Sequence, residues 1–155
     1  MREIGRVDDE LRPEQSATFD ASVKAMMYWC RLNEQLVLER HGSGARVIVG
    51  FERLSRVRPV AARYQRLAAA TKLTLFAVRD AKLPFEAHVV DAAGGPLERE
   101  WFFAVDAPRY QALLVARDQS GFGPTGPIAG RRFVGLGTHD SQLVRLAIDA
   151  LERMT

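Results

Sequence analysis

The strongest constraint on the fold is a strand-helix-strand pattern in the middle of the chain. Residues 45–51 (ARVIVGF) are rich in β-branched side chains and flanked by glycines, which predicts a strand. Residues 57–68 carry apolar side chains at the i, i+3, i+4 spacing of an amphipathic helix. Residues 72–78 (KLTLFAV) are apolar at both alternations, as in a strand covered on both faces. Because a helix is the usual crossover between parallel strands, these segments predict a parallel β-α-β unit.

The second half of the chain predicts shorter strands joined by turns. Glycine and proline separate the apolar segments after Pro84, and such short joins favour antiparallel pairing. A closing helix is expected from Thr138 or Asp140 to Met154. The expected strands lie around residues 87–90, 97–105, 112–117 and 132–136.

The N-terminal part predicts a leader followed by a helix. Residues 1–15 are charged and aperiodic, so we expect a poorly ordered leader there. From Ser16 a helical pattern runs to about Arg40, with Ser16 or Thr18 as its N-cap and Gly42 as its stop.

This predicted helix has an unusually wide apolar surface made of two stripes. The second stripe includes Trp29, Leu32 and Leu36. A helix on a domain surface needs one apolar stripe of somewhat over about 100°. We therefore expect this helix either to lie deep in the core or to offer Trp29, Leu32 and Leu36 to a partner, such as a second copy in a homodimer.

These elements predict an α+β fold in a single domain. With 155 residues the chain has the length of one domain, which we place at residues 16–155. Its centre is expected to be a mixed sheet of about five or six strands that opens with the parallel β-α-β unit. An N-terminal and a C-terminal helix flank this sheet.

Composition excludes several protein classes. The chain is 47% hydrophobic and 26% charged, which is typical of a globular protein. It has no apolar run of the roughly 20 residues that span a bilayer and no signal-peptide core, so we expect a cytoplasmic protein without a membrane partner. Cys30 is the single cysteine, which excludes an internal disulfide. The net charge of +3 is modest for a nucleic-acid binder.

The motifs that suggest catalysis have simpler structural explanations. A G-x-G-x-x-G string spans residues 121–126, but it precedes a strand and not a helix, which favours a loop over a dinucleotide site. His139, Asp140 and Ser141 are adjacent at a helix start, where capping explains them better than a triad does. The three histidines lie far apart and show no metal-ligand spacing. We therefore predict no catalytic residue, no metal site and no enzyme.

Two groups of residues are candidates for ligand binding. Arg53 and Arg56 follow the first strand of the β-α-β unit, and Arg79 and Asp80 follow the second, at the sheet edge where α/β proteins bind ligands. With Phe51 as a wall, this corner suits an anionic ligand. The alternative is a salt bridge from Arg53 or Arg56 to Asp80. The second group comprises Tyr64 and Trp101 with Phe103, for which core packing is the alternative.

Six blocks of sequence resemble the DICT sensory domain. The chain is similar to this family in the order and spacing of mostly apolar positions from about Val47 to Leu151. Such domains occur beside diguanylate cyclases and histidine kinases, and a role in light-linked signalling has been proposed for them. The blocks are VGFERLSR (49–56), RYQRLA (63–68), LFAVRD (75–80), EWFFAVD (100–106), ALLVARD (112–118) and FVG (133–135).

The resemblance implies a non-catalytic signal-input module that acts through ligand-dependent or partner-dependent contacts. No output domain follows in this sequence, so the implied partner is a diguanylate cyclase or histidine kinase type protein in trans, unless the chain is an excised domain. The cofactor, if there is one, stays open. The alternative is a regulatory protein-interaction module or a basic nucleic-acid-binding module, which would use a group of arginines: Arg53, Arg56, Arg58, Arg63 and Arg66.

Overall fold

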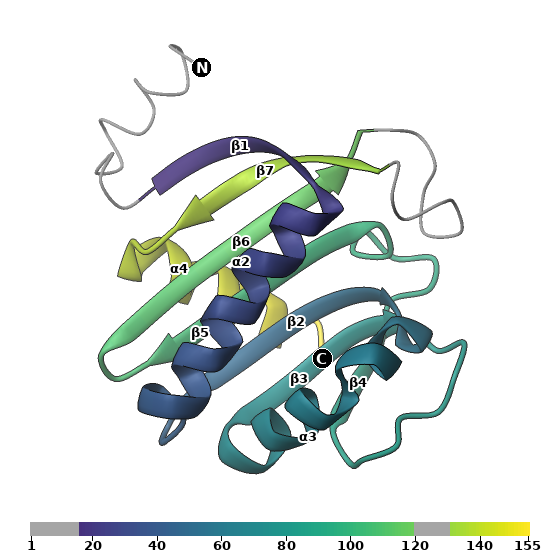
Figure 1. Cartoon of the computed structure of the whole chain (residues 1–155), viewed down its shortest axis with the longest axis horizontal. Coiled ribbons are helices and arrows are strands. Elements are labelled where there is room, and N and C mark those ends of the chain that lie inside the picture. Colours follow the sequence, from purple (N-terminus) through teal and green to yellow (C-terminus); the bar gives the residue numbers. More distant parts are fainter. Residues whose placement is uncertain (1–15, 120–130) are drawn as a thin grey trace.

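The computed structural model describes residues 16–119 and 131–155, and within them seven strands form one mixed sheet. The strand order is β1-β7-β6-β5-β2-β3-β4, with β1 and β4 at the two edges (Figure 1). The sheet has one strand more than the upper expectation of six. The leader predicted for residues 1–15 and the glycine string at 121–126 lie outside the described residues.

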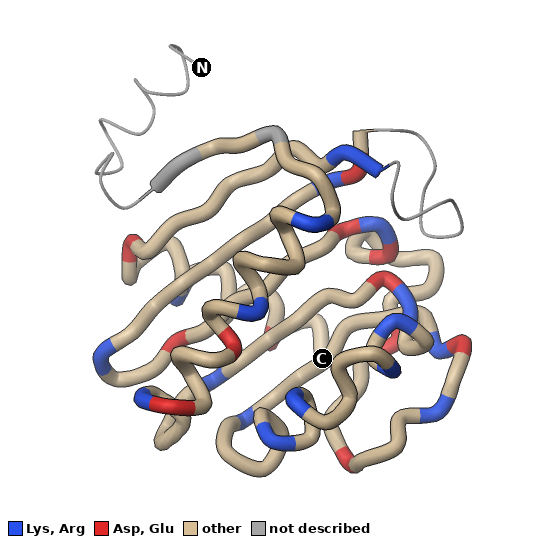
Figure 2. Tube along the Cα trace, viewed as in Figure 1, with Lys and Arg blue, Asp and Glu red and all other residues tan. Residues whose placement is uncertain are grey.

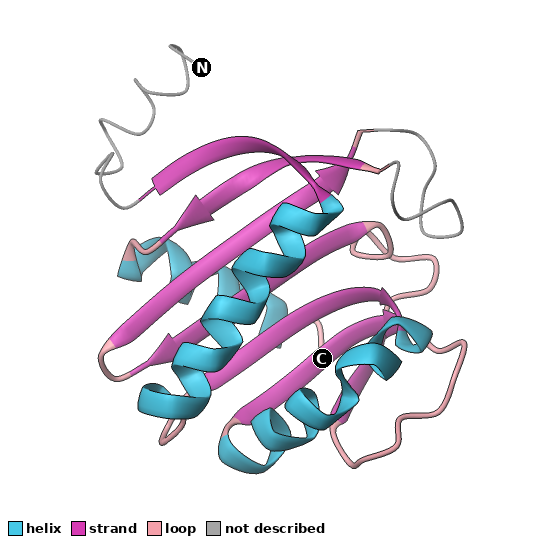
Figure 3. Cartoon of the chain, viewed as in Figure 1, coloured by secondary structure: helices cyan, strands magenta, loops and turns pink. Residues whose placement is uncertain are grey.

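The β-α-β unit is confirmed. Strands β2 (Arg46–Arg53) and β3 (Lys72–Val78) pair in parallel, with Val49 opposite Leu75. The crossover is a 3₁₀ segment, η2 (Leu54–Val60), that continues into helix α3 (Ala61–Ala70). Both strands are buried on both faces because helices cover the sheet on each side (Figure 3).

The second half of the chain is antiparallel, as expected, except for one strand. Strand β5 (Glu100–Ala107) pairs antiparallel with both β2 and β6 (Tyr110–Asp118), and β6 pairs antiparallel with β7 (Arg132–Thr138). Strand β4 (His88–Asp91) instead runs parallel to β3, which corrects the prediction. The reason is the long connection from residue 79 to residue 87, which returns β4 to the starting end of β3 and so allows parallel pairing.

The first described segment is a strand and not the start of a helix. Strand β1 (Ser16–Ser22) pairs antiparallel with β7, and Phe19 and Ala21 pack against the core. Helix α2 (Val23–Leu36) begins only after it, with the Ser22 hydroxyl accepting a hydrogen bond from the Ala25 amide at 3.3 Å. The predicted N-caps at Ser16 and Thr18 are therefore wrong, because pairing with β7 overrides the helical spacing.

Two hydrophobic layers lie on the two faces of the sheet. Alternate residues of β2 divide between them: Val47 and Val49 face α2 and α3, whereas Ile48 faces α4 (Ser141–Glu152). Figure 1 shows α2 and α3 on the near face and α4 behind the sheet. Helix α2 ends in a π-helical turn, η1 (Val37–His41), whose Val37 is fully buried.

The first apolar stripe of α2 is buried, and the second is only partly covered. Val23, Met26 and Cys30 belong to the core, and burial raises the pKa of the Cys30 thiol to about 12. Trp29 and Leu36 are half-buried, and Leu32 is 42% exposed. Within the part of the chain that the structure describes, no helix is long and apolar enough to cross a membrane.

A charged cluster around Arg46 joins α4 to the sheet, and we predict that it makes stability dependent on pH. Arg46 lies 2.7 Å from Asp106 and 3.1 Å from both Asp149 and Glu152. Partial burial raises the pKa of Asp106, but the hydrogen bonds from Arg46 and Gln111 outweigh it and hold this pKa below its usual value.

Because the folded-state pKa of Asp106 lies below the unfolded value, its contribution is present at neutral pH and is lost as the pH falls through the folded pKa. Asp106→Asn should therefore lower the free energy of unfolding by about 1 kcal/mol at pH 7 and leave it unchanged near pH 2. Urea denaturation at both pH values measures this difference. Asp149→Asn, at a more exposed partner of Arg46, should have a smaller effect. An equal loss for Asp106→Asn at both pH values would contradict the assignment.

Candidate functional site

Charged side chains converge at the end of the sheet where β2 and β3 finish. They come from β2, β5 and β6 and from Arg131, just before β7. Strand β2 has an irregularity between Gly50 and Glu52, which leaves Phe51 out of the pairing with β3. Glu52 has φ of 64°, a conformation that residues other than glycine rarely adopt. Its side chain is nevertheless only 1% exposed. A buried carboxylate on a strained backbone is held by its surroundings, and such positions cluster at functional sites.

Glu52 is held by a fully buried arginine. The Nη1 and Nη2 atoms of Arg131 donate to the two carboxylate oxygens of Glu52 at 2.8 and 2.7 Å. The Arg131 Nε donates to Asp118 at 2.8 Å, and the guanidinium lies 4.8 Å from the centre of the Phe133 ring. Arg56 adds a second cation at 3.7 Å from Glu52. The site therefore joins β2, the end of β6 and the start of β7 through charge-assisted hydrogen bonds.

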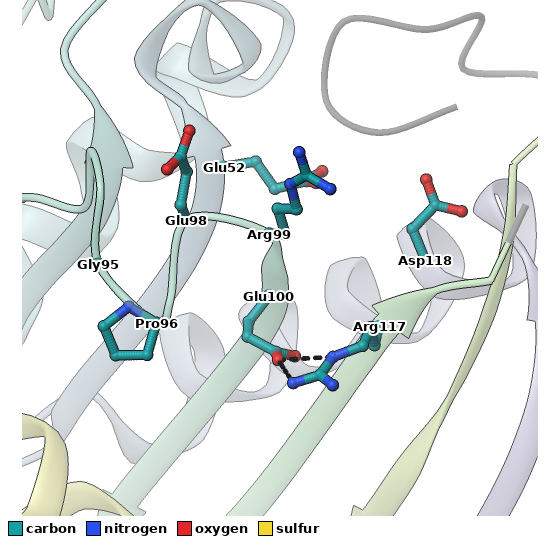
Figure 4. A pocket seen from close by; sticks show the side chains of 8 residues that line it. All are labelled: Glu52, Gly95, Pro96, Glu98, Arg99, Glu100, Arg117 and Asp118. Carbon is teal, nitrogen blue, oxygen red and sulfur yellow. Dashed lines mark hydrogen bonds and ion pairs between the residues drawn. The ribbon is translucent and has the colours of Figure 1, made fainter. Parts of the chain in front are cut away.

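A cleft of about 350 Å³ opens beside this buried network (Figure 4). The turn that precedes β5 forms one side and the end of β6 the other, and Glu100 pairs with Arg117 between them. Glu98 accepts a hydrogen bond from the Gly94 amide at 2.9 Å, whereas Arg99 is exposed. Charges of both signs therefore face the cleft, which suits a polar ligand. Its lining residues are Glu52, Gly95, Pro96, Glu98, Arg99, Glu100, Arg117 and Asp118.

The arginines predicted at this edge of the sheet lie next to the cleft, and they contact oxygen atoms of the chain itself. Arg53 lies 3.5 Å from Asp80, the salt bridge that the sequence offered as the alternative. Ser55 donates to Asp80 from its amide at 2.9 Å and from its hydroxyl at 2.6 Å. Burial raises the pKa of Asp80, but the bonds from Ser55 and the charge of Arg53 outweigh it and keep this pKa below its usual value. Arg79 donates to the carbonyl of Val89 at 2.6 Å.

The predicted aromatic residues pack in or against the core. Phe51 and Tyr64 meet edge to face with their ring centres 4.9 Å apart. Trp101 is half-buried and packs edge to face on Phe133, 5.2 Å between ring centres. The structure thus brings Phe51 and Tyr64 together beneath the corner and places Trp101 at the start of β5. Their role in ligand binding stays a prediction.

Three residues of the site escaped the sequence analysis as functional candidates. Glu52 and Asp118 appear there only as members of family blocks, and Arg131 appears in none of them. The one local signal was Glu52 itself, a charged residue at the end of a buried strand. Arg131 is separated from Glu52 by 79 residues, so no spacing rule links them.

The remaining motif residues are placed as structural elements. Asp140 caps α4, and one of its carboxylate oxygens accepts hydrogen bonds from the amides of Gln142 and Leu143. His139 contacts the carbonyl oxygen of Gln111 through Nδ1 at 2.9 Å, away from Ser141. Among the described residues, no cluster of three or more His, Cys, Asp or Glu side chains could hold a metal ion.

Comparisons with known proteins give one family and a shared fold. A family model described as a sensory domain in diguanylate cyclases and two-component systems matches residues 7–119. No curated protein sequence matches the chain.

Solved structures similar to this chain include a polyphosphate kinase from Porphyromonas gingivalis, with a TM-score of 0.50 at 14% identity over 90% of this chain. This chain covers 23% of the length of that kinase. A phospholipase D family member, Nuc, from Salmonella typhimurium has a TM-score of 0.45 at 6% identity and is covered over 94% of its length, with 90% of this chain. NucT from Helicobacter pylori has a TM-score of 0.46 at 10% identity, with 90% and 96% coverage. At 14% identity the likeness to the kinase shows a shared fold alone.

Proposed function

Because the chain belongs to the DICT family of sensory domains, we propose that it is a non-catalytic signal-input module that binds a polar small molecule in the cleft beside Glu52. The observation that carries the proposal is the family match over residues 7–119. The cleft supports it, because three carboxylates in its lining are each held in a fixed position by an arginine, which gives the cleft a pre-organised polar surface. These carboxylates are Glu52, Glu100 and Asp118. The proposal places the chain in the cytoplasm.

The output of the module is proposed to be contact between α2 and a signalling protein of the diguanylate cyclase or histidine kinase type. The family description names diguanylate cyclases and two-component systems, which supports this class of partner. On α2, Tyr28 is 64% exposed and Leu32 42%, and their i, i+4 spacing gives an apolar row facing solvent, while Met27, 49% exposed, lies on another side of the helix. Of the three residues predicted for this contact, Leu32 lies in the row, while Trp29 and Leu36 are half-buried beside it. Light-linked signalling and a homodimer remain further parts of the proposal.

The alternative of nucleic-acid binding has little support from the arginines that it requires. Three of them point toward carboxylates of the chain: Arg53 pairs with Asp80, Arg56 with Glu52 and Arg63 with Glu34. Figure 2 shows basic and acidic residues interspersed along the described chain. Binding along the backbone of a nucleic acid needs an extended set of cations that face outward together, so we favour the sensory module.

A comparison of Arg99→Glu with Arg109→Glu tests the ligand site. Arg99 lines the cleft and is exposed, whereas Arg109 is exposed in the turn between β5 and β6. We expect wild-type protein to retain a small molecule in a native mass spectrum, or to be stabilised by one from a set of charged metabolites. A ligand at about 100 times its Kd adds about 2.7 kcal/mol to the stability of the folded state, which is a clear shift in Tm.

Arg99→Glu should abolish the stabilisation by an anionic ligand, or increase that by a cationic one, because the side chain lines the cleft. Arg109→Glu changes the net charge equally and should leave the stabilisation unchanged. Equal behaviour of the two variants, or a bare chain that no compound stabilises, would contradict ligand binding in the cleft. The same spectrum also reports whether the protein is a dimer, in which a second copy would cover the apolar row on α2. A visible absorption band recorded beside it would support the light-linked role.

A further inference from the structure

A second cavity lies between the two helices on one face of the sheet. It has a volume of about 430 Å³ and is bounded by α2 and η1 on one side and by η2 and α3 on the other. Figure 1 shows these helices crossing the same face of the sheet with β2 running between them. A volume of this size is within the range of small-molecule sites. We call it the interhelical groove, defined by Arg31, Gln35, Leu38, Val60, Arg63 and Arg66 with their neighbours.

Arginines outnumber acidic residues in the lining of the interhelical groove. Three of its lining residues are arginines, Arg31 from α2 and Arg63 and Arg66 from α3, against one acid, Glu39. Glu39 is already engaged by Gln35, whose Nε2 donates to it at 2.9 Å. The floor carries the apolar side chains of Leu38 and Val60. Guanidinium groups above an apolar floor suit an organic molecule that carries a phosphate group.

One arginine of the groove is already shared with a buried acid. Glu34 lies beneath the groove on α2 and is 4% exposed, and Arg63 reaches both of its oxygens at 3.3 and 3.4 Å. These distances exceed the usual range for such bonds, whereas Arg131 holds Glu52 at 2.7 to 2.8 Å. The Glu34–Arg63 pair is therefore looser than the Arg131–Glu52 pair. Because an unpaired carboxylate at this depth is costly, Arg63 can turn to another anion only when Glu34 becomes protonated.

Three other side chains that are charged or titratable lie around Glu34. Tyr64 of α3 hydrogen-bonds to it, Arg31 lies near it on α2, and the buried Cys30 thiol is a neutral neighbour on the same helix. Burial raises the pKa of Glu34, and the attraction of Arg63 works against this rise. Removing Arg63 would raise the pKa of Glu34 further, which favours the protonated form of Glu34.

We propose that the interhelical groove binds a phosphate monoester through Arg31, Arg63 and Arg66, and that the ligand competes with Glu34 for Arg63. The O–H bond that forms on Glu34 uses a proton from solvent or from the phosphate monoester itself, whose second pKa is about 6 and which loses that proton when it binds as the dianion. The competition loosens a contact that ties α2 to α3, so binding in this groove acts on the helix that carries the exposed apolar row. This inference goes beyond the proposed function and does not rest on the cleft beside Glu52.

Calorimetric titration with AMP, adenosine and inorganic phosphate tests the binding. AMP should bind at least about tenfold more tightly than adenosine, because one charge-assisted hydrogen bond has that effect. Arg66→Glu should abolish AMP binding. Arg58→Glu is the matched control, since Arg58 is an exposed arginine of η2 outside the groove. Equal weakening in the two variants would reveal general charge attraction and overturn the site, as would an absence of heat with both AMP and phosphate.

Proton uptake tests the competition for Arg63. The heat of AMP binding is measured in buffers of different ionisation enthalpy from pH 5 to 8. Because the AMP phosphate has a second pKa of about 6 and releases a proton when it binds as the dianion, the expected signal is a difference: wild-type protein should take up more protons, or release fewer, than Glu34→Gln, which still binds AMP. Equal proton exchange in wild-type and Glu34→Gln protein at every pH would overturn the competition. If Glu34→Gln does not fold, proton uptake by wild-type protein at about pH 8, where AMP is already the dianion, decides the competition, and its absence overturns it.

Discussion

Arg131→Met is expected to lower the free energy of unfolding by about 3 to 5 kcal/mol, since breaking a buried ion pair leaves a charge uncompensated. Arg131 is 0% exposed and supplies charge to Glu52 and Asp118, which are 1% and 7% exposed. Methionine fills a similar space but donates no hydrogen bond. At the size of this chain the loss corresponds to a fall in Tm of roughly 6 to 20 °C.

Thermal unfolding followed by circular dichroism measures this loss, with Arg117→Met as the matched control. Arg117 also pairs with a carboxylate, that of Glu100, but the Arg117 side chain is 69% exposed and Glu100 is 12% exposed, so its removal should lower the Tm clearly less than the removal of Arg131 does. Glu52→Gln combined with Arg131→Met should recover part of the loss, because the pair then disappears together. A Tm for Arg131→Met that matches Arg117→Met would show that the buried network does not stabilise the sheet end.

Gly135→Ala is expected to be comparably severe because the neighbouring strand leaves no room for a side chain. A Cβ at Gly135 would lie 2.0 Å from the carbonyl oxygen of Val115 and 2.8 Å from the Cα of Ala116. Both are backbone atoms of β6, which pairs with β7 at this position, so relief requires the ladder to open. We expect a loss of about 3 kcal/mol or more, at the upper end for overpacking.

Gly95→Ala provides the control for this substitution. A Cβ there would make only an ordinary contact, 3.5 Å from the carbonyl oxygen of Ala92, so stability should change by no more than about 0.5 kcal/mol. Urea denaturation gives both values, and amide hydrogen exchange should show faster opening of β6 and β7 in Gly135→Ala. A stable Gly135→Ala variant with unchanged exchange would mean that β6 and β7 pair less closely than described.

The two errors in the predicted fold have one cause. Residues 16–22 carry apolar side chains at spacings that also fit a helix, and only their pairing with β7 makes them a strand. Likewise, residues 88–91 fit a strand in either direction, and the course of the chain after β3 decides that it runs parallel. Both outcomes depend on partners distant in sequence, whereas propensity describes each segment alone.

The candidate site was found only in part for the same reason. The arginines after β2 and the Arg79-Asp80 pair after β3 were located correctly at one sheet edge, because parallel strands end at the same side. Their pairing state was not predictable, since Asp80 was a possible partner for both Arg53 and Arg56. Arg56 instead lies close to Glu52, because the irregularity at the end of β2 changes the position of Glu52 relative to β3.

The elements with a local signal follow from the amino-acid sequence alone. The alternation of Val47, Ile48 and Val49, the helical spacing around Tyr64 and the cap at Asp140 each depend on a few neighbouring residues. The sheet order, the burial of Arg131 against Glu52 and the groove between α2 and α3 depend instead on how the chain folds in three dimensions. These features join segments far apart along the chain, and they form because buried charges and strand edges must find partners wherever the fold brings them together.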